Sequence, residues 1–518
     1  MLIVTAAQMR ELDRATIAAG TPGWTLMQRA GQGATQVLLD AFPRLRRKRV
    51  VIVCGKGNNG GDGYVIARAL KKRGVAVEVF LLGEEKRVEG DAALALRSWR
   101  RAGGRIRPLH TAADIATLQQ RLEGAVCAVD AIFGTGLKGD VMGPAADVIT
   151  LLNACGVPLF AVDIPSGLDS DTGFALGCAV QAEVTATFAC PKIGQVVHPG
   201  SDHCGRLAVI DIGIDDEALA RVEPRTVLLD ADRVAALVPR REPTAHKGDC
   251  GHVLIIAGGR GKTGAAMLAA RAAARAGSGL VTAAVAASQQ PLVAGGLLEA
   301  MTDILADTDG EIGFDASGLA RVVRDRDVIV CGPGIGTGDG ARATVAWLLA
   351  QSDKPLVLDA DGLNCLAAML RGSSPPAARA SRDLVLTPHP GEMARLSGRS
   401  TAEVQRDRLG IARSFAAAHD CVLVLKGAGT VIAAPDGRAA VNSTGNPGMA
   451  SGGMGDVLAG VIGALIGQGL SAFDAASVGV YLHGLAADMA AADLGTIGLL
   501  ASDVIEALPR AIRASTPE

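Results

Sequence analysis

Two glycine-rich segments carry the residue types most suited to chemistry. The first, GKGNNGGDG (55–63), follows an apolar run and has the spacing GxGxxG. This spacing predicts a tight turn whose backbone amides lie at a helix N-terminus and favour a phosphate group. Asn58, Asn59 and Asp62 place amides and a carboxylate where a redox dinucleotide site normally has small residues. A capped turn without a ligand is the alternative interpretation, because Asn and Asp are common in such loops.

The second segment is GNPGMASGGMGDVLAG (445–460), in which Gly455-Asp456 precedes an apolar helical pattern that begins at Val457. Backbone amides at such a helix start would form an anion hole, and the helix dipole would favour charge on a transferring phosphoryl group. An aspartate beside this hole can take a proton from an attacking hydroxyl. The alternative interpretation is a plain helix N-cap.

A third segment, AGGRGKTGAA (257–266), contains the letters GKT of a phosphate-binding P-loop. That motif also needs a glycine five residues before Gly261, where this chain has Ile256 inside a strand pattern. We therefore reject a P-loop and expect Lys262 to be an exposed loop lysine.

The elements that position these segments alternate between apolar strands and Ala/Leu-rich helical patterns, such as 64–74 and 91–104. This alternation predicts βαβ units and a parallel sheet covered on both faces. Because ligands bind at the carboxyl ends of strands in such sheets, the loops after the strands are the candidate sites. The clearest strands, several with the loop that follows, are 50–54, 75–82, 125–133, 157–164, 252–259, 327–334, 355–362, 383–390 and 421–427.

Composition and length restrict the class of protein. A chain of 518 residues predicts two or three domains, and we place the boundary near residues 215–226. A content of 49% hydrophobic residues, 66 glycines and only 3% aromatics suits an α/β protein with closely packed helices. A net charge of -2 without long runs of one sign argues against a nucleic-acid partner. Ten cysteines without a C-x-x-C spacing give no support for a zinc ribbon or a disulfide framework.

Neither the N-terminal segment nor the most apolar segment has the pattern of a targeting signal or a membrane span. Residues 1–13 lack the basic region and apolar core of a signal peptide, and Thr5 with Gln8 predicts a capping box. The apolar stretch from Val457 is interrupted by Gln468, so we expect a buried helix and no membrane span. We expect a cytoplasmic protein with neither a membrane nor a nucleic acid as partner.

Four motifs of the first half, KGNNGGDG (56–63), DAIFGTGLKG (130–139), VDIPSGLD (162–169) and TFACPKIG (187–194), resemble in order and spacing the NAD(P)H-hydrate epimerase domain of the YjeF N-terminal type. The resemblance implies a Rossmann-like domain over residues 1–218, a hydrated nicotinamide nucleotide as substrate and a bound K+. The implied K+ ligands are Asn59, Asp130 and Ser166. The implied substrate-binding residues are Asn58, Asn59, Gly60, Gly61, Asp62, Gly134, Thr135, Gly136, Leu137, Lys138, Gly139, Asp140 and Asp163.

The chemistry of these residues agrees with that implication. Amide, carboxylate and hydroxyl oxygens suit a hard cation of low charge. Epimerisation at the hydrated ring carbon needs proton transfer, which a positioned carboxylate can supply. Asp163 is the first candidate for this role and Lys192 the second, although a lysine after a strand is also a common phosphate or salt-bridge partner. The glycine loop is then expected to hold a damaged cofactor as substrate, without hydride transfer.

In the second half, LVLDADGLN (356–364), LTPHPGEMARL (386–396), VLVLKGAGTVI (422–432) and the Gly-Asp segment resemble the ADP/ATP-dependent NAD(P)H-hydrate dehydratases, which have a ribokinase-like α/β fold. The resemblance covers residues 226–518, so the whole chain resembles the bifunctional NAD(P)H-hydrate repair enzymes. It implies contacts to the hydrated substrate from Ala265, Gly334, His389 and Asp456, with Asp456 as base. The implied nucleotide-binding residues are Lys426, Gly427, Ala428, Gly429, Thr430 and Gly455.

The mechanism implied by this resemblance is phosphorylation of the C6 hydroxyl of the S hydrate, followed by elimination of phosphate, with Mg2+ bridging the nucleotide oxygens. The resemblance implies ADP as the phosphate donor in bacterial members of the family. Because the Ala/Arg-rich composition is typical of a bacterial protein, we expect ADP here. We also expect a homo-oligomer. Two alternatives are a ribokinase-like vitamin or sugar kinase with an accessory nucleotide-binding domain, and a scaffold that uses the first domain only for binding.

Overall fold

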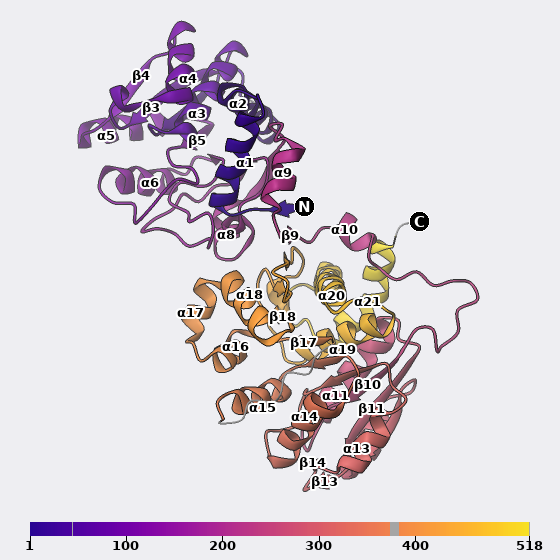
Figure 1. Cartoon of the computed structure of the whole chain (residues 1–518). Coiled ribbons are helices and arrows are strands. Elements are labelled where there is room, and N and C mark those ends of the chain that lie inside the picture. The colour runs from indigo at the N-terminus through magenta and orange to yellow at the C-terminus, as the bar shows by residue number, and fades with distance from the viewer. Residues whose placement is uncertain (44, 373–382, 517–518) are drawn as a thin grey trace. The chain divides into compact units, whose positions relative to one another are not determined.

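The computed structural model describes residues 1–43, 45–372 and 383–516. The chain divides into two compact units, which we call the N-terminal domain (Leu2–Thr226) and the C-terminal domain (Val227–Glu518, with Met1), as Figure 1 shows. Positions 44, 373–382 and 517–518 of the ranges expected for these domains lie outside the described residues.

The sheet of the N-terminal domain is parallel throughout, in the order β4-β3-β2-β5-β6-β7-β8. The strand order reverses between β2 and β5, so a ligand is expected at the carboxyl ends of these two strands. The four strands expected in this domain are confirmed; three of them are shorter than expected, whereas β2 begins one residue earlier. The strands of this sheet are β2 (Arg49–Cys54), β3 (Ala76–Leu82), β4 (Ile106–Leu109), β5 (Cys127–Ala131), β6 (Leu159–Val162), β7 (Val184–Phe188) and β8 (Arg206–Ile210), and the short strand β1 (Leu2–Ile3) lies outside it.

Helices cover both faces of this sheet, because each central strand is apolar on both sides. In β2, Val50 and Ile52 belong to one hydrophobic cluster, while Val51 and Val53 belong to another. The expected capping box at Thr5 is confirmed. The helices are α1 (Ala6–Ala18), α2 (Gly23–Ala41), α3 (Asn58–Lys72), η1 (Glu85–Arg87), α4 (Gly90–Arg101), α5 (Ala112–Leu122), α6 (Pro144–Ala154), α7 (Ile193–Val196), α8 (Gly200–Cys204) and α9 (Asp216–Val222).

The sheet of the C-terminal domain runs in the order β9-β20-β19-β18-β17-β16-β15-β10-β11-β12. It is parallel from β12 to β18 and antiparallel at β19 and β20. The strand order reverses between β10 and β15, which gives this domain a switch point of its own. The strands are β9 (Thr226–Leu228), β10 (His252–Ile256), β11 (Leu280–Ala286), β12 (Met301–Leu305), β15 (Val328–Cys331), β16 (Leu356–Leu358), β17 (Leu384–Leu386), β18 (Val422–Leu425), β19 (Val431–Ala433) and β20 (Ala439–Val441), with a separate ribbon of β13 (Asp307–Thr308) and β14 (Glu311–Ile312).

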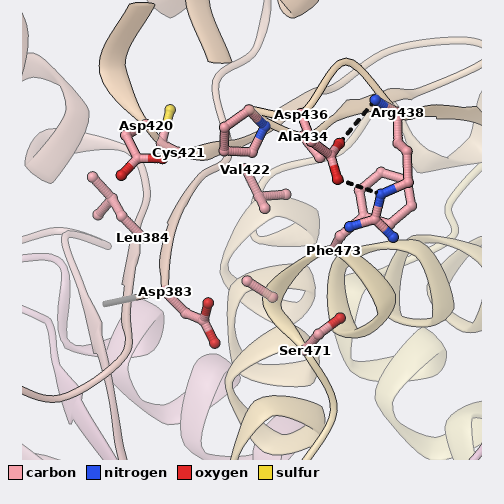
Figure 2. A pocket seen from close by; sticks show the side chains of 12 residues that line it. Asp383, Leu384, Asp420, Cys421, Val422, Ala434, Asp436, Arg438, Ser471 and Phe473 are labelled. Atoms are coloured by element: carbon pink, nitrogen blue, oxygen red, sulfur yellow. Dashed lines mark hydrogen bonds and ion pairs between the residues drawn. The ribbon is translucent and has the colours of Figure 1, made fainter. Parts of the chain in front are cut away.

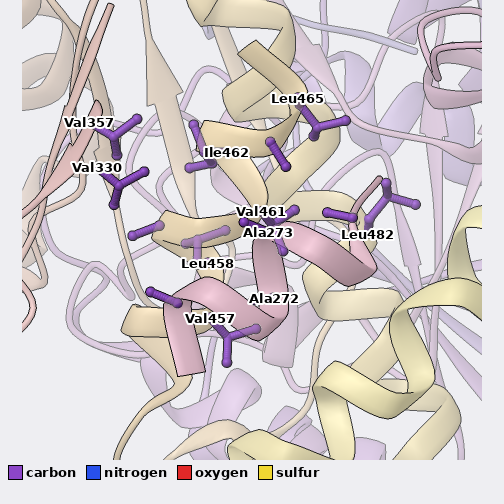
Figure 3. Packing of buried hydrophobic residues seen from close by; sticks show 14 of the residues in the cluster. Ala272, Ala273, Val330, Val357, Val457, Leu458, Val461, Ile462, Leu465 and Leu482 are labelled. Carbon is purple, nitrogen blue, oxygen red and sulfur yellow. The ribbon is translucent and has the colours of Figure 1, made fainter. Parts of the chain in front are cut away.

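The helices of the C-terminal domain enclose a core of small and branched side chains. Helix α19 lies against the alanine-rich α11, and a Cβ atom at Gly460 would collide with the backbone of Ala269, so the glycine permits this close approach (Figure 3). The helices are α10 (Ala231–Ala235), α11 (Thr263–Arg275), η2 (Ala287–Gln289), α12 (Gln290–Gly296), α13 (Ala316–Val323), α14 (Asp339–Gln351), α15 (Asp361–Leu370), α16 (Pro390–Ser397), α17 (Thr401–Arg406), α18 (Arg408–His419), η3 (Pro447–Met449), α19 (Met454–Gly467), α20 (Ala472–Leu494) and α21 (Ala501–Ser515).

The apolar stretch from Val457 forms most of helix α19, and this helix is buried, as expected. Helix α19 ends at Gly467, and a second helix, α20, begins at Ala472. Among the described residues, no helix combines the length and the apolar character that crossing a membrane requires.

Candidate active sites

The glycine loop of the N-terminal domain joins β2 to α3, which begins at Asn58. A Cβ atom at Gly55 would collide with the carbonyl oxygen of Ile132, and one at Gly60 would collide with that of Gly55. Gly55 is therefore required for packing between the loops that follow β2 and β5, and Gly60 is required for the tight turn of the glycine loop itself. A Cβ atom at Gly57 would meet nothing within 4 Å, so the open side of the turn lies there.

Asn59, Asp130 and Ser166 meet around the backbone of Phe133, although they come from three separate motifs. The Asn59 Nδ2 atom donates to the Phe133 carbonyl oxygen at 2.9 Å, and the Phe133 amide donates to Ser166 Oγ at 2.8 Å. Ser166 donates to Asp130 through both Oγ (2.6 Å) and its amide (2.7 Å). These hydrogen bonds bring together the three residues that the family resemblance implies as K+ ligands, and the bound ion stays a prediction.

Two features of this cluster suit a cation. The Asn59 Oδ1 atom is buried and has no hydrogen-bond partner among the described residues. Asp130 is fully buried, and burial raises its pKa to about 6 although hydrogen bonds from Ser166 oppose the rise. A nearby cation would satisfy the amide oxygen and stabilise the carboxylate.

Asp163 and Lys192 form an ion pair at the carboxyl ends of β6 and β7. The Lys192 Nζ atom lies 2.5 Å from Asp163 Oδ1 and also donates to Thr187 Oγ1 (2.9 Å) and the Phe188 carbonyl (3.2 Å). The Lys192 side chain is fully buried, whereas 15% of the Asp163 side chain is exposed. Lys192 is thus a salt-bridge partner of the candidate acid/base, which was one of the interpretations left open for this lysine.

The backbone of Asp163 has a φ of +64°, in the left-handed region that residues other than glycine rarely adopt. Gln195 holds the segment in place, because its Nε2 atom donates to the Asp163 carbonyl (2.6 Å) and its Oε1 atom accepts from the Lys192 amide (2.8 Å). The carboxylate is therefore held in position by the surrounding backbone and by Lys192.

Asp62 and Asp13 extend the acidic group around Asp163. Burial, the charge of Asp163 and the charge of Asp13 raise the pKa of Asp62 well above its usual value, and Lys192 opposes the rise. Burial and the charge of Asp163 raise the pKa of Asp13 to about 6, again opposed by Lys192. Asp13 lies on helix α1 and was not predicted as a site residue. The only feature of the sequence that could have indicated it is its place next to the apolar Leu12, which is buried.

The loop 134–140 begins beside this group, because a Cβ atom at Gly134 would lie 3.4 Å from Asn59 Cβ. Its later part is exposed, at Gly136 and from Lys138 to Asp140. Among the described residues, no hydrogen bond or ion pair joins Lys138 or Asp140 to the Asn59 cluster. The structure thus brings the start of this loop to the candidate site, and substrate contacts from its later residues stay a prediction.

In the C-terminal domain, the loops after β10 and β15 meet at the switch point. Gly334 has a φ of +68°, and a Cβ atom there would lie 3.0 Å from Lys262 Cβ and 3.4 Å from Ala265 Cβ. Ile256 is the last residue of β10, and the half-exposed Lys262 pairs with Asp361 at 3.1 Å. These positions agree with the rejection of a P-loop and bring Gly334 and Ala265 together.

Lys426 lies at the centre of a polar cluster built at the ends of β16, β17 and β18. Its Nζ atom donates to Asp359 Oδ1 at 2.6 Å and lies 3.9 Å from Glu392 Oε2. Thr387 Oγ1 donates to the same Asp359 oxygen at 2.8 Å. Burial alone would lower the pKa of Lys426, but Asp359 and Glu392 raise it above its usual value. The predicted set omitted Asp359 and Glu392, although each follows a predicted strand closely.

Gly455 and Asp456 lie in the first turn of α19, which begins at Met454 and so includes both residues, whereas the sequence pattern placed its start at Val457. A Cβ atom at Gly455 would lie 3.1 Å from Lys426 Nζ and 3.4 Å from Asp359 Oδ2. Burial and the charge of Asp359 raise the pKa of Asp456 to about 7, with Lys426 opposing. The start of helix α19 therefore adjoins the Lys426 cluster. The pKa of the Asp456 carboxyl group, about 7, suits proton transfer near neutral pH.

His389 follows β17 and caps helix α16. Its Nδ1 atom accepts from the amides of Gly391 (3.0 Å) and Glu392 (3.4 Å), and its Nε2 atom lies 3.3 Å from Glu392 Oε1. Burial, followed by the charges of Lys426 and Arg395, lowers its pKa. The histidine thus has a structural role as a cap, and its half-exposed ring leaves a substrate contact as a prediction.

A cavity of about 270 Å³ lies at the other ends of the strands. Its lining includes Asp383 before β17, Asp420 before β18 and Phe473 at the start of α20 (Figure 2). The Arg438 guanidinium lies 4.8 Å from the centre of the Phe473 ring and pairs with Asp436 at 2.6 Å. None of the residues predicted for catalysis or binding lines this cavity, so it is separate from the candidate site.

Comparison with known proteins gives matches over both domains. A family model described as NAD(P)H-hydrate dehydratase matches residues 253–510, and one described as YjeF-related protein N-terminus matches residues 24–194. The bifunctional NAD(P)H-hydrate repair enzyme of Moorella thermoacetica is 45% identical, over 99% of this chain and 97% of the relative. The Escherichia coli enzyme of the same description is 40% identical, over 94% and 89%. A crystal structure of the ADP/ATP-dependent NAD(P)H-hydrate dehydratase from Bacillus subtilis is 32% identical, covering 56% of this chain and 98% of its own, with a TM-score of 0.49.

Proposed function

The chain belongs to the family of bifunctional NAD(P)H-hydrate repair enzymes, and from this premise we propose which residues of its two domains carry the reactions. It is an enzyme of nicotinamide nucleotide repair, with an epimerase domain followed by a dehydratase domain. The expected fold class, a Rossmann-like N-terminal domain and a ribokinase-like C-terminal domain, is confirmed.

In the N-terminal domain, Asp163 moves the proton that epimerisation at the hydrated ring carbon requires. Its partial exposure and its φ of +64° support this role, because a buried salt bridge with only a structural task would not need a strained, accessible carboxylate. Lys192 orients the carboxylate through the 2.5 Å contact between its Nζ atom and Asp163 Oδ1.

A potassium ion fits the cluster of Asn59, Asp130 and Ser166. The support is the buried Asn59 Oδ1 atom, which has no partner among the described residues, beside the buried carboxylate of Asp130. When bound, K+ supplies a fixed positive charge next to the glycine loop. The side chains of the cluster hold the loops after β2 and β5 together through Phe133.

In the C-terminal domain, Asp456 takes the proton of the C6 hydroxyl of the S hydrate. The hydroxyl oxygen then attacks the terminal phosphorus of ADP, and AMP leaves with the electron pair of the broken P–O bond. The C6–O bond next breaks, phosphate leaves with that electron pair, and a proton is lost from C5. The ring double bond returns, so the products are NAD(P)H, AMP and phosphate.

The observation that carries this assignment is the position of Gly455 and Asp456 at a helix N-terminus beside Lys426. Lys426 and the amides of this first turn stabilise negative charge on the transferring phosphoryl group. Asp359 and Asp361 already accept from Lys426 and Lys262, so a Mg2+ ion carried by the nucleotide phosphates fits better than one held by several carboxylates. When bound, Mg2+ neutralises charge on those phosphates.

One assay tests the proposed function. The purified protein is incubated with mixed hydrate epimers, K+, Mg2+ and either ADP or ATP, and the absorbance of the reduced nicotinamide is followed together with phosphate release. Complete conversion of both epimers with AMP formation is expected with ADP. A stable phosphorylated product without returning absorbance would instead identify a kinase, and no turnover would favour a scaffold.

Several finer expectations stay predictions. They are the use of ADP in preference to ATP, a cytoplasmic location, a homo-oligomeric state, and the expectation that the protein has no nucleic-acid partner. Parallel titration with the two nucleotides decides the first, and light scattering of the purified protein decides the oligomeric state.

A further inference from the structure

Arg408, the first residue of helix α18, lies behind the loop Lys426–Thr430 and is 6% exposed. One terminal nitrogen donates to Gln405 Oε1 at 2.7 Å, and the other donates to the carbonyls of Leu425 (3.0 Å) and Lys426 (3.4 Å). Its Nε atom has no hydrogen-bond partner among the described residues, and none of the described carboxylates forms an ion pair with it. The buried guanidinium thus donates its hydrogen bonds to two backbone carbonyls and one neutral side chain.

Such an arrangement is costly for the fold. Burial lowers the pKa of Arg408 to about 10, so the side chain is still a cation at neutral pH. A buried charge without a counter-charge destabilises a protein unless something compensates for it. An anion that binds the adjacent loop would supply this compensation.

Gly427 joins Arg408 to the loop. Its φ is +139°, and a Cβ atom there would lie 3.0 Å and 3.2 Å from the two terminal nitrogens of Arg408. The absence of a side chain therefore lets the guanidinium lie against the turn. On the other side of the turn, Thr430 Oγ1 donates to the Gly427 carbonyl at 2.9 Å.

The contact of Arg408 with the Lys426 carbonyl also sets the direction of the next amide. In a trans peptide the carbonyl and the following N–H point in opposite directions. Because the Lys426 carbonyl points towards Arg408, the N–H of Gly427 points away from it. No backbone carbonyl of the described residues accepts from this N–H, so it is free to donate to an anion on the loop's outer side.

We propose that Arg408 is a positioning residue of the nucleotide site, whose forked guanidinium holds the Leu425 and Lys426 carbonyls and turns the Gly427 amide towards the phosphates of ADP. This inference rests on the proposed function, which places the nucleotide on Lys426–Thr430. Two donors in a fixed fork are needed, so a lysine cannot replace the arginine although it keeps the charge.

The test uses the full-length chain with Arg408→Lys and Arg408→Met, and Arg413→Lys as the matched control. Arg413 lies on the same helix and also donates to a backbone carbonyl, that of Gly437 at 3.0 Å, away from the loop. Losing charge-assisted hydrogen bonds of this kind raises the KM for ADP about tenfold or more in Arg408→Lys, and further in Arg408→Met. The KM for the hydrate, the epimerase activity and all constants of Arg413→Lys are expected to stay at wild-type values.

A milder variant covers the case in which the Arg408 variants do not fold. Gln405 is exposed, so Gln405→Ala loosens the fork without changing the core, and the KM for ADP is expected to rise about twofold to threefold. A wild-type KM for ADP in Arg408→Lys or, where that variant is unfolded, in Gln405→Ala overturns the inference. Equal losses in hydrate and ADP affinity also overturn it, since they mark a general structural role. If the wild-type protein itself fails to bind ADP, the proposed function fails first.

Discussion

Replacing Asp456 by Asn separates the proton-transfer role of this side chain from its role in the fold. The carboxyl group lies in the first turn of α19, where burial and the charge of Asp359 raise its pKa to about 7. Asn keeps the size and the hydrogen-bonding ability of the side chain but cannot act as a base. We expect ADP-dependent repair to fall about 10²- to 10⁴-fold, the usual contribution of a general base, while epimerisation continues.

The raised pKa also predicts a pH dependence. Only the ionised carboxylate accepts a proton, so kcat/KM of the dehydratase is expected to rise about tenfold between pH 6 and pH 8 and then to level off. Raising the pKa from 3.8 to about 7 corresponds to roughly 4 kcal/mol against the charged form. The folded state binds this proton more tightly than the unfolded chain, so the carboxylate begins to destabilise the domain above about pH 4, with the full cost above about pH 7.

Asp456→Asn is therefore expected to be less active but more stable, with a higher melting temperature at pH 8 and little difference near pH 4. The assays are the absorbance of the reduced nicotinamide with ADP, epimer interconversion without ADP, and thermal unfolding at both pH values. Asp339→Asn, which changes a fully exposed carboxylate of the same domain, is the control and should match the wild type. Normal ADP consumption by Asp456→Asn, or a flat profile of kcat/KM from pH 6 to pH 8, would refute the role given to Asp456.

Three further variants test the remaining assignments. Asp163→Asn is expected to stop epimerisation and to leave the dehydratase active. It is also expected to lower the melting temperature, because the buried charge of Lys192 becomes unpaired at a cost of about 3–5 kcal/mol. Loss of both activities would contradict the assignment of Asp163 to the epimerase alone. Asn59→Ala is expected to weaken epimerisation and to abolish its response to replacing K+ with Na+, which a titration of both salts measures; an unchanged K+ response would exclude this residue as a ligand. Gly455→Ala places a Cβ atom 3.1 Å from Lys426 Nζ and is expected to lower kcat for repair about tenfold or more, since one misdirected donor in an anion hole costs at least this much; an unchanged kcat would show that the helix start does not contact the transferring group.

Much of the fold could be predicted from the sequence, because each strand and the loop after it are local features. The apolar run 50–54 followed by glycines predicted β2 and the start of α3, and the same pattern predicted β10, β16 and β18. Since ligands bind at the carboxyl ends of the strands in such sheets, the loops after the strands were the expected ligand sites. The set Asn59, Asp130 and Ser166 was implied by the family resemblance, and the structure brings these three side chains together around Phe133.

Other parts of the sites depend on contacts between segments far apart in the chain. Asp13 reaches the Asp163 group from helix α1, and Arg408 reaches the nucleotide loop from helix α18, yet neither follows a strand. Their local sequence is that of an ordinary charged helix residue. Only the packing of these helices on the sheet places the two side chains beside the candidate sites.

The sequence alone determined the α/β class, the places where strands end and the polar side chains that follow them, because hydrophobic periodicity and turn-forming residues act over a few positions. The tertiary structure decided which strand ends are neighbours and how deeply each charge is buried. The pKa of Asp456 illustrates the difference. Its position at a helix start is written in the sequence, but its value near 7 comes from burial and from Asp359, almost a hundred residues earlier in the chain, because electrostatic energies depend on distance in space and on access to water.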